Sequence, residues 1–355
     1  MKSWLITGGA GFIGSNFVRQ ARAATTARLV IFDALTYAGN LATIADLIDG
    51  ERVQFVHGDI RDPAAVDEIF ARHDIDCVLH FAAESHVDRS ILTPQACIET
   101  NVHGTMNLLA AAREGWREAR GRRCFLHVST DEVYGTLSDT DPPFDETTAY
   151  APNSPYAASK AASDHLVRAW SHTYGLPAII TNCSNNYGPW QFPEKLIPLT
   201  ILNAVALREL PVYGDGLQVR DWLHVQDHCA ALLAVVERGV AGETYCIGGN
   251  NQQRNLAVVE TICDLVDQQL GRKPGTARGL IRHVTDRPGH DRRYSIDCNK
   301  ARRELGWTPQ HTFQSALAEV VQWYLANAGW VDAIRSGEYM QFYERQYRHR
   351  LQATS

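Results

Sequence analysis

Tyr156 and Lys160 are the first pair in the chain whose types and spacing suit acid–base chemistry. They stand four positions apart, so on a helix they would share one face. A nearby ammonium group stabilises a phenolate, which lowers the pKa of the phenol and allows it to remove a proton from a substrate hydroxyl. The spacing therefore predicts a tyrosine base assisted by a lysine.

A second group comes directly after an apolar run at 125–128 that we expect to form a strand. It is Ser129–Glu132, which contains Thr130, Asp131 and Glu132. Neighbouring carboxyl groups push their pKa values apart, so Asp131 could act as a protonated acid and Glu132 as an ionised base. Oxidation of a carbinol needs no such pair, so the pair favours an additional elimination. Spacing alone leaves open that the two residues only cap a turn.

The amino-terminal segment Thr7–Gly14 is a glycine-rich loop between a short apolar run and an amphipathic stretch. Gly9, Gly11 and Gly14 match the G-x-G-x-x-G pattern, and Gly8 adds a further glycine. Without side chains the backbone can turn tightly and let a pyrophosphate approach the amino end of a helix. The context of strand, loop and helix is the one that a dinucleotide-binding loop requires.

Two acidic residues follow the next two expected strands. Asp33 lies about 20 residues after the glycine loop, where a carboxylate accepts hydrogen bonds from the adenosine ribose and repels a 2′-phosphate. Asp59 is expected to contact the adenine edge. These positions favour NAD over NADP as the cofactor. Together with Tyr156 and Lys160, they predict hydride transfer between a carbinol and a nicotinamide.

The elements that must position these residues follow an alternating pattern. Buried apolar runs alternate with amphipathic stretches, which is typical of a parallel sheet covered on both faces. We therefore predict an α/β fold with a doubly wound, Rossmann-type sheet. The expected strands are 4–6, 29–32, 53–56, 77–81, 125–128 and 178–183, and the expected helices are 13–24, 64–72, 101–114 and 154–174.

Beyond about residue 189 the pattern changes, which indicates a smaller C-terminal α/β lobe for substrate. We expect a dinucleotide domain at 1–188 with a returning segment at about 221–248, and a mainly substrate-binding lobe at 189–355. The tail at 338–355 is expected to be a surface extension. Helices are expected at 196–207, 227–236, 258–270 and 312–326, and a short strand at 220–222.

Composition excludes several other classes of protein. The 355 residues favour about two domains, and 45% hydrophobic with 21% charged residues is typical of a globular chain. The net charge of −6 (34 basic against 40 acidic residues) argues against nucleic-acid binding. No apolar run approaches the length of about 20 residues that spans a bilayer, and the first residues carry no signal-peptide pattern. We expect a cytoplasmic protein that binds neither nucleic acid nor membrane.

Cysteine and histidine usage points to no metal site. Eight scattered cysteines form no C-x-x-C pair, so we expect buried free thiols in a reducing compartment. His86 and His290 have no neighbours with the spacing of metal ligands, so hydrogen-bonding roles are expected instead.

At the residues described above, the chain resembles the extended short-chain dehydrogenase/reductase family and, within it, the nucleotide-sugar 4,6-dehydratases. The resemblance extends over essentially the whole chain and is far more specific than the glycine loop. It is carried by Asp33–Asn40, Ala82–Ser90, Ser129–Gly135, Asn182–Pro189, Pro193–Pro198 and Asp286–Tyr294.

The resemblance implies a hydro-lyase that converts dTDP-glucose into dTDP-4-keto-6-deoxyglucose and water. Tyr156 would remove the C4 hydroxyl proton, assisted by Thr130 and Lys160, while NAD takes the C4 hydride. Glu132 would then remove the C5 proton as Asp131 protonates the departing C6 hydroxyl. The hydride returns to C6, so NAD is expected to remain bound. The implied pathway is dTDP-rhamnose and O-antigen synthesis, whereas the sequence pattern leaves the choice between thymidine and uridine open.

The resemblance also implies two sets of binding residues. Around NAD it implies Gly8, Gly11, Phe12, Ile13, Gly14, Asp33, Leu35, Thr36, Asp59, Ile60, Ala82, Ala83, Ser85, Thr100, Tyr156, Lys160 and Asn186. Around the nucleotide sugar it implies Ser85, Thr130, Asn185, Lys195, Leu196, Pro211, Tyr213, Arg220, Asn255, Arg287 and His290. Guanidinium groups match phosphate oxygens, and a tyrosine ring can stack on a pyrimidine.

A homodimer is implied as well, formed through two helices of each subunit. Here these would be 101–114 and 154–174, whose alanine-rich faces would allow close approach of the helices. The alanines expected on these faces are Ala110, Ala111, Ala157, Ala161 and Ala162.

Two other functions remain open at this stage. A nucleotide-sugar 4-epimerase or a UDP-glucuronate decarboxylase would share the glycine loop, Tyr156 and Lys160, and Asp131 is the residue that discriminates against both. A non-enzymatic redox sensor or scaffold of the same fold would typically lack the tyrosine or the lysine.

Overall fold

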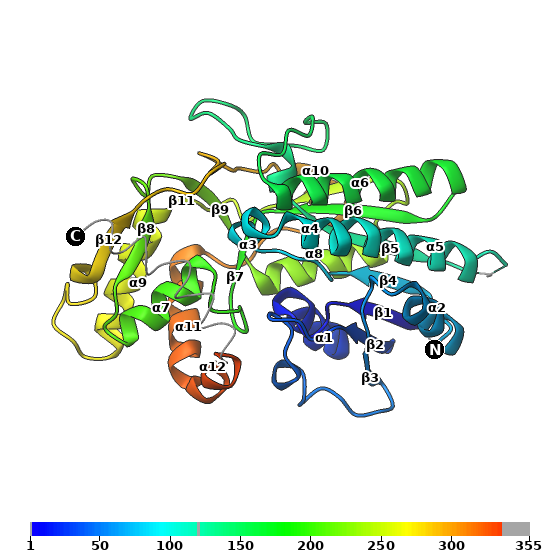
Figure 1. Cartoon of the computed structure of the whole chain (residues 1–355), viewed down its shortest axis with the longest axis horizontal. Helices are drawn as coiled ribbons and strands as arrows, with labels where there is room; N and C mark the ends of the chain where they lie inside the picture. Colours follow the sequence, from blue (N-terminus) through cyan, green and yellow to red (C-terminus); the bar gives the residue numbers. More distant parts are fainter. Residues whose placement is uncertain (1, 119–120, 336–355) are drawn as a thin grey trace.

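A parallel sheet forms the centre of the larger lobe (Figure 1). The structure, a computed structural model, describes residues 2–118 and 121–335 of the chain. Within these residues, seven parallel strands run in the order β10-β6-β5-β4-β1-β2-β3, so the predicted doubly wound fold is confirmed. The strands are β1 (Ser3–Thr7), β2 (Arg28–Asp33), β3 (Val53–His57), β4 (Cys77–His80), β5 (Cys124–Thr130), β6 (Ala178–Cys183) and β10 (Thr244–Ile247).

Helices cover both faces of this sheet, which is why its strands are almost continuously apolar. Two separate buried clusters, one on each face, join the helices to the strands. One face carries α1 (Phe12–Ala24), α8 (Val225–Arg238) and α10 (Asn299–Leu305). The other carries α2 (Pro63–Arg72), α5 (Thr105–Gly115) and α6 (Pro155–Tyr174).

The segment predicted as one helix at 101–114 begins differently. Ile98–Gly104 forms a π-helical stretch that continues into α5. The carbonyl of Asn101 accepts hydrogen bonds from the Thr105 hydroxyl at 2.5 Å and the Ser163 hydroxyl at 2.6 Å. These side-chain donors occupy the carbonyl and accompany the wider turn, a feature that often marks functional sites.

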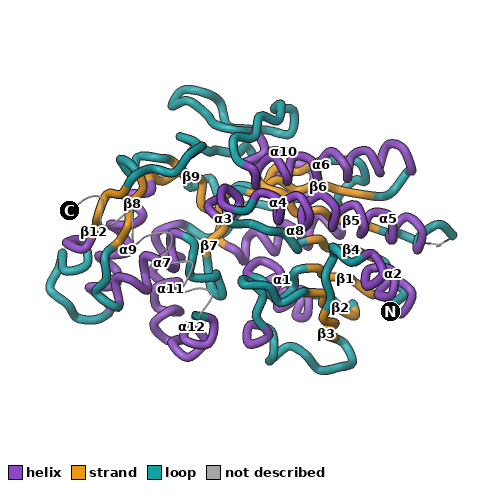
Figure 2. Tube along the Cα trace, in the orientation of Figure 1, coloured by secondary structure: helices purple, strands orange, loops and turns teal. Residues whose placement is uncertain are grey.

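The smaller lobe packs around its own buried cluster. Figure 2 shows its helices gathered beside two short sheets of the described chain. Its helices are α7 (Leu196–Val205), α9 (Asn255–Gln269), α11 (Phe313–Ala326) and α12 (Ala328–Ile334). The short strands are β7 (Asn185–Tyr187), β8 (Leu210–Tyr213), β9 (Val219–His224), β11 (Gln252–Arg254) and β12 (Ile281–Val284), while α3 (Val87–Leu92) and α4 (Pro94–Cys97) follow β4.

An aromatic cluster joins the end of the described chain to its beginning. The ring of Trp190, a residue with φ of +70°, lies 4.7 Å from the ring of Trp323 and 5.3 Å from that of Trp330. The guanidinium of Arg19, on α1, stacks on Trp190 at 4.7 Å. The indole N–H of Trp330 donates to the hydroxyl of Thr43 at 3.2 Å. Helix α12 therefore packs against the segment that follows β2.

Three further predictions can be compared with the structure. All eight cysteines are buried and free, as expected. The predicted tail at 338–355 lies outside the described residues. In the described part of the chain no helix has the length and apolar character needed to cross a bilayer.

The five alanines expected on the faces of the two helices differ in exposure. Ala110 is exposed and Ala162 is half-buried, whereas Ala111, Ala157 and Ala161 are buried within the subunit. The reason is that α5 and α6 pack against each other and against the sheet.

Candidate active site

A cavity of about 300 Å³ opens at the carboxyl ends of the central strands, where doubly wound sheets place their ligands. Segments that follow β1, β2, β3, β4, β5 and β6 all contribute to it. Most residues expected around the cofactor line it. These are Gly8, Gly11, Phe12, Ile13, Gly14, Asp33, Thr36, Asp59, Ile60, Ala82, Ala83, Ser85, Thr100, Tyr156 and Asn186.

The glycine loop leaves no room for side chains. Gly8 has φ of +69°, and a Cβ there would lie 2.6 Å from the backbone nitrogen of Ala82. A Cβ on Gly14 would lie 2.3 Å from the carbonyl oxygen of Gly8. Gly11 caps α1 without a side-chain hydrogen bond, so the amino end of this helix is left to a ligand. A cradle of this kind fits the pyrophosphate of a dinucleotide.

Both predicted acidic residues line the cavity and are fixed by local contacts. The carboxylate of Asp33 accepts hydrogen bonds from the backbone N–H groups of Ala10 at 2.9 Å and Leu35 at 2.8 Å. Burial raises the pKa of Asp33, and these backbone donors oppose the shift. Asp59 is paired with Arg61 at 2.6 Å. Leu35 does not line the cavity itself; its backbone holds Asp33 instead.

The predicted acid–base residues meet in the same cavity. Thr130 ends β5 and caps the short 3-10 turn Asp131–Tyr134 by accepting a hydrogen bond from the N–H of Glu132 at 3.3 Å. Ser154 caps α6 in the same way and so places Tyr156 in its first turn. The side chains of Thr130, Asp131, Glu132 and Tyr156 all line the cavity.

Asp131 and Glu132 differ in their surroundings. Burial, together with the charges of Glu132 and Asp221, raises the pKa of Asp131 well above its usual range. Burial also raises the pKa of Glu132, but the cations Arg287, Lys195 and Arg220 oppose that shift. The three cations thus set the surroundings of Glu132 apart from those of Asp131.

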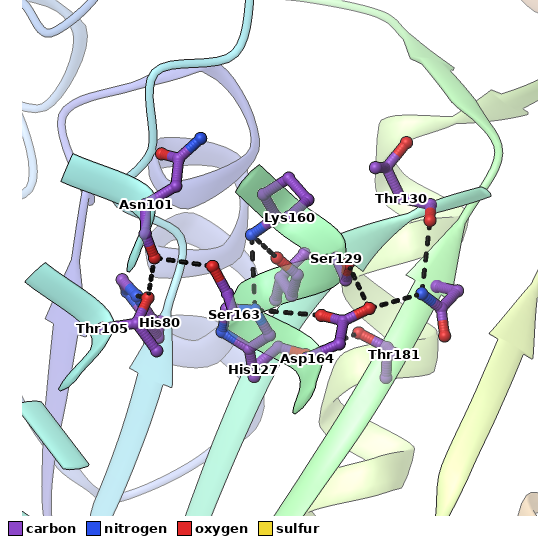
Figure 3. A network of polar contacts seen from close by, with 12 residues as sticks. His80, Asn101, Thr105, His127, Ser129, Thr130, Lys160, Ser163, Asp164 and Thr181 are labelled. Carbon is purple, nitrogen blue, oxygen red and sulfur yellow. Dashed lines mark hydrogen bonds and ion pairs between the residues drawn. The ribbon is translucent and has the colours of Figure 1, made fainter. Parts of the chain in front are cut away.

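Lys160 does not line the cavity that contains Tyr156. Its ammonium donates to the carbonyl of Val128 at 2.9 Å and contacts His127 Nε2 at 3.4 Å (Figure 3). Burial and the charge of Glu132 raise the pKa of Tyr156 well above its usual range, while the Thr130 hydroxyl lowers it. The predicted lowering of the tyrosine pKa by Lys160 is therefore not found in the protein alone.

The residues expected around the nucleotide sugar fall into two groups. Ser85, Thr130, Asn185 and Lys195 line the cavity. The amide oxygens of Asn185 and Asn255 are buried and have no hydrogen-bond partner among the described residues. The remaining residues lie outside the cavity wall: Leu196, Pro211, Tyr213, Arg220, Asn255, Arg287 and His290.

Several of these outer residues gather around Asp88. The Tyr213 hydroxyl donates to Asp88 at 2.9 Å, and the Arg287 guanidinium lies 3.8 Å from the same carboxylate. The ring of His290 meets that of Tyr213 edge-on at 6.1 Å, and His290 Nδ1 contacts Asp286 at 2.6 Å. The segments that supply these residues thus converge beside Glu132, whose pKa Arg287 affects directly.

Sequence reasoning missed some residues that shape the cavity. Glu194 is buried in its wall and accepts a hydrogen bond from Arg89 at 3.0 Å, and the Arg89 guanidinium stacks on Tyr37 at 3.7 Å. Both residues lie in segments that carry the resemblance, but no local pattern marks them. Arg61 was missed as well, although its position two residues after Asp59 is a usable signal.

The described residues contain no group of three or more His, Cys, Asp or Glu side chains that could hold a metal ion.

Comparison with known proteins is consistent with this site. A family model described as GDP-mannose 4,6 dehydratase matches residues 5–320. A dTDP-glucose 4,6-dehydratase of Shigella flexneri is 57% identical over 358 residues, which cover 98% of this chain and 99% of that protein.

Solved structures show the same fold. The crystal structure of a dTDP-glucose 4,6-dehydratase from Streptomyces venezuelae, with NAD bound, is 45% identical with a TM-score of 0.86 and covers 94% of this chain and 99% of that one. A UDP-glucose 4-epimerase from Thermus thermophilus in complex with NAD is 27% identical with a TM-score of 0.82, covering 92% and 100%. By sequence and by structure, this chain belongs to the dTDP-glucose 4,6-dehydratase family.

Proposed function

We propose that the protein converts dTDP-glucose into dTDP-4-keto-6-deoxyglucose and water. The observation that carries this proposal is the juxtaposition of Asp131, Glu132 and Tyr156 in one cavity beside a glycine cradle that fits a dinucleotide. Bound NAD would supply a hydride acceptor at C4 and a hydride donor at C6. The cradle, Asp33 and Asp59 would hold the cofactor, because all of them line the same cavity.

We assign the first proton transfer to Tyr156, which would take the proton of the C4 hydroxyl. A substrate ketone formed at C4 acidifies the C5–H bond, and Glu132 would then remove that proton. Three cations (Lys195, Arg220 and Arg287) act on Glu132 and favour its ionised form. Burial raises the pKa of Asp131, which suits the acid that protonates the leaving C6 hydroxyl.

The proton balance gives Thr130 a specific role. Glu132 can return its proton to C5, but each turnover leaves one extra proton on Tyr156 and one missing from Asp131. The hydroxyl of Thr130 lies 3.4 Å from Asp131 Oδ1 and also lowers the pKa of Tyr156. Thr130 is therefore placed to pass the proton from Tyr156 to Asp131 without exchange with bulk water.

We propose that Lys195 on the cavity wall, together with residues that lie outside the wall, binds the nucleoside diphosphate. Lys195, Arg220 and Arg287 would neutralise the diphosphate, and Tyr213 would stack on the base. Thymine and uracil differ by one methyl group, whose burial contributes on the order of 1 kcal/mol. Competition between dTDP-glucose and UDP-glucose for the same preparation would therefore measure the base preference directly.

Incubation with dTDP-glucose tests the proposal. The expected product is a 4-keto-6-deoxy sugar with its characteristic absorbance in alkali, and deuterium placed at C4 should appear in the C6 methyl group. A C4 epimer in place of this product would favour the epimerase alternative, and loss of carbon dioxide from UDP-glucuronate would favour the decarboxylase. A product without deuterium in its methyl group would overturn the internal hydride return.

We also propose that the protein is a homodimer. Large apolar side chains are exposed at the end of α6 and on the helical segments that pack against it. These are Leu92, Ile98, Met106 and Tyr174. Light scattering should therefore give the mass of two chains, and Met106→Glu should lower it, whereas Leu270→Glu on exposed surface of the smaller lobe should not. A wild-type mass of one chain at micromolar concentration would contradict the proposal.

The remaining assignments extend from the same family membership. We propose a division into a cofactor domain (1–188, with 221–248 returning to it) and a sugar-nucleotide lobe (189–355). The eight free cysteines support a reducing, cytoplasmic location. Use of the product in dTDP-rhamnose or O-antigen synthesis is part of this proposal and would be tested by the sugar content of a deletion strain.

A further inference from the structure

A buried group of titratable side chains lies next to the ammonium of Lys160 (Figure 3). The Lys160 ammonium contacts His127 Nε2 at 3.4 Å, and the same ring nitrogen lies 3.2 Å from Asp164 Oδ1. All three side chains are buried. Asp164 stands one helical turn after Lys160 on α6, and His127 comes from β5.

The other oxygen of Asp164 is held by three donors from different parts of the fold. Asp164 Oδ2 accepts hydrogen bonds from the hydroxyls of Ser129 and Tyr150, each at 2.9 Å, and from the amide of Asn182 at 3.2 Å. Hydrogen bonds from several donors favour the charged form of a carboxylate. The carboxyl group of Asp164 is therefore fixed in place by three donors.

The groups that face Lys160 leave Asp164 as its anionic partner. Burial and the Lys160 charge lower the pKa of His127 to about 4, so this ring is neutral at pH 7. The ring of His80, 5.2 Å from His127, also has its pKa lowered well below the usual range by burial. Burial raises the pKa of the Cys183 thiol to about 12.

Burial and the nearby charges act on the pKa of Lys160 in opposite directions. Burial lowers it to about 8, while the charges of Asp164 and Cys183 oppose that shift. The buried ammonium is therefore close to losing its proton under ordinary conditions. Removal of one partner from a buried ion pair leaves the other charge uncompensated, and a lysine can respond by becoming neutral.

We propose that Asp164 is the buried counter-charge of Lys160 and, together with His127, forms a positioning group that keeps the ammonium charged and in place one turn from Tyr156. The importance of that charge for turnover rests on the proposed function, whereas the charge pairing itself does not. Neither Asp164 nor His127 lines the cavity, so both act through Lys160.

The direct test is the titration of Lys160 in the purified holoenzyme. The chain has only five lysines, at positions 2, 160, 195, 273 and 300, so protein labelled with ¹³C-lysine gives few signals. The signal that is missing from the spectrum of Lys160→Arg is that of Lys160. In Asp164→Asn we expect the Lys160 pKa to fall by about one unit or more. An unchanged pKa would overturn the proposal, whatever the activity of the protein.

Tyr150→Phe is the matched control, because it removes one hydrogen bond to Asp164 without removing the charge. Its Lys160 pKa should remain near that of the wild type. If Asp164→Asn does not fold, the double variant Asp164→Asn/Tyr150→Phe is measured instead and compared with Tyr150→Phe. The double variant lacks the Tyr150 hydroxyl that would otherwise face the new amide. The same fall in the Lys160 pKa is expected, and its absence contradicts the counter-charge.

The pH profile of kcat tests the link to turnover. Charged Lys160 is lost as pH rises through its pKa, so a lower pKa moves the alkaline limb of the profile to lower pH. Asp164→Asn should show this shift by about one pH unit or more, with little change in KM. Asp164→Glu should restore much of the wild-type limb, since a second cavity of about 250 Å³ lies against Asp164.

These outcomes distinguish the proposed function from the proposed role of Asp164. A wild-type protein that makes no 4-keto-6-deoxy product would refute the proposed function, while the lysine titration would still decide on the counter-charge. A wild-type protein that makes the product, combined with identical pH profiles for Asp164→Asn and Tyr150→Phe, would refute the positioning role.

Discussion

Asp131 and Glu132 are neighbours in sequence, yet the fold gives them opposite electrostatic surroundings. Asp131 is buried and faces the carboxylates of Glu132 and Asp221, whereas Glu132 faces cations from the smaller lobe. At the scale of single residues, this difference separates an acid from a base of nearly the same chemistry. The cations come from segments far along the chain, so the base is completed only when both lobes are in place.

The role of Asp131 predicts a stalled variant. Asp131→Asn should still oxidise C4 but should lose water more slowly by about 100-fold or more, because the amide cannot donate a carboxylic proton to the leaving hydroxyl. Rapid mixing should reveal accumulation of the reduced nicotinamide chromophore. Asp139→Asn, at an exposed position, should behave as the wild type. Product formation at the wild-type rate in Asp131→Asn would remove Asp131 from the mechanism.

The glycine cradle predicts a second effect at single-residue scale. In Gly14→Ala the new Cβ would meet the Gly8 carbonyl oxygen at 2.3 Å, so the loop must shift and its fit to a dinucleotide is lost. The purified variant should contain much less NAD than the wild type, as measured from the extracted cofactor. Gly329→Ala, where a Cβ meets nothing within 4 Å, should retain full occupancy. Equal NAD content in both variants would contradict the cradle.

Much of the site could be predicted from single residues, but their partners could not. Asp33, Asp131 and Tyr156 occupy positions whose meaning follows from the strand or helix they begin or end. The contact of Lys160 with His127 was not predicted, because His127 comes from β5 and helical spacing relates Lys160 only to residues of its own helix. The spacing of Lys160 and Asp164 was available as a signal, but it does not reveal that both are buried.

At the scale of elements, α6 carries Tyr156, Lys160 and Asp164 on successive turns. Its start is therefore part of the catalytic geometry. Ser154 caps it by accepting a hydrogen bond from the N–H of Ala157 at 3.1 Å, and Pro155 occupies the first helical position. A proline at that position is already constrained to a helical φ.

The cap predicts a loss of both stability and rate in Ser154→Ala. The substitution should lower the free energy of unfolding by about 1 kcal/mol. It should also lower kcat more than it raises KM, because Tyr156 lies in the loosened first turn. Thr312→Ala removes the equivalent cap of α11, which supplies no cavity residue, and should lower stability alone. Equal effects of the two variants on kcat would contradict a link between this cap and the chemistry.

The longer elements could be predicted because each has enough residues to show a period. The central strands β1 to β6 and helices α1, α2, α6 and α11 were found within a few residues of their ends. The strands β7, β8, β10, β11 and β12 have only three or four residues and were missed. The π-helical stretch was missed because side chains distant in sequence hold the Asn101 carbonyl.

At the scale of the whole molecule, buried histidines predict sensitivity to acid. Burial lowers the pKa of His127 to about 4 and that of His228 to about 3, so both remain neutral in the fold at pH values where the unfolded chain takes up protons. Stability is therefore lost as pH falls below about 6.5, by roughly 1.4 kcal/mol per pH unit for each such histidine.

Thermal unfolding at a series of pH values checks this expectation. The midpoint should fall between about pH 6.5 and about pH 4.5. His228→Gln should reduce the pH dependence of the midpoint by the contribution of one histidine. His165→Gln, at an exposed position, should leave that dependence unchanged. A midpoint that rises on acidification would contradict the sign of these shifts.

The packing of α12 against the start of the chain has a consequence for biosynthesis. Trp330 and Ile334 belong to one apolar cluster with Tyr37, Ala38 and Phe192, and Ala38 and Phe192 form part of the cavity wall. During synthesis α12 is made after every segment that lines the cavity. This part of the wall therefore reaches its final packing only when residues 328–334 have been added.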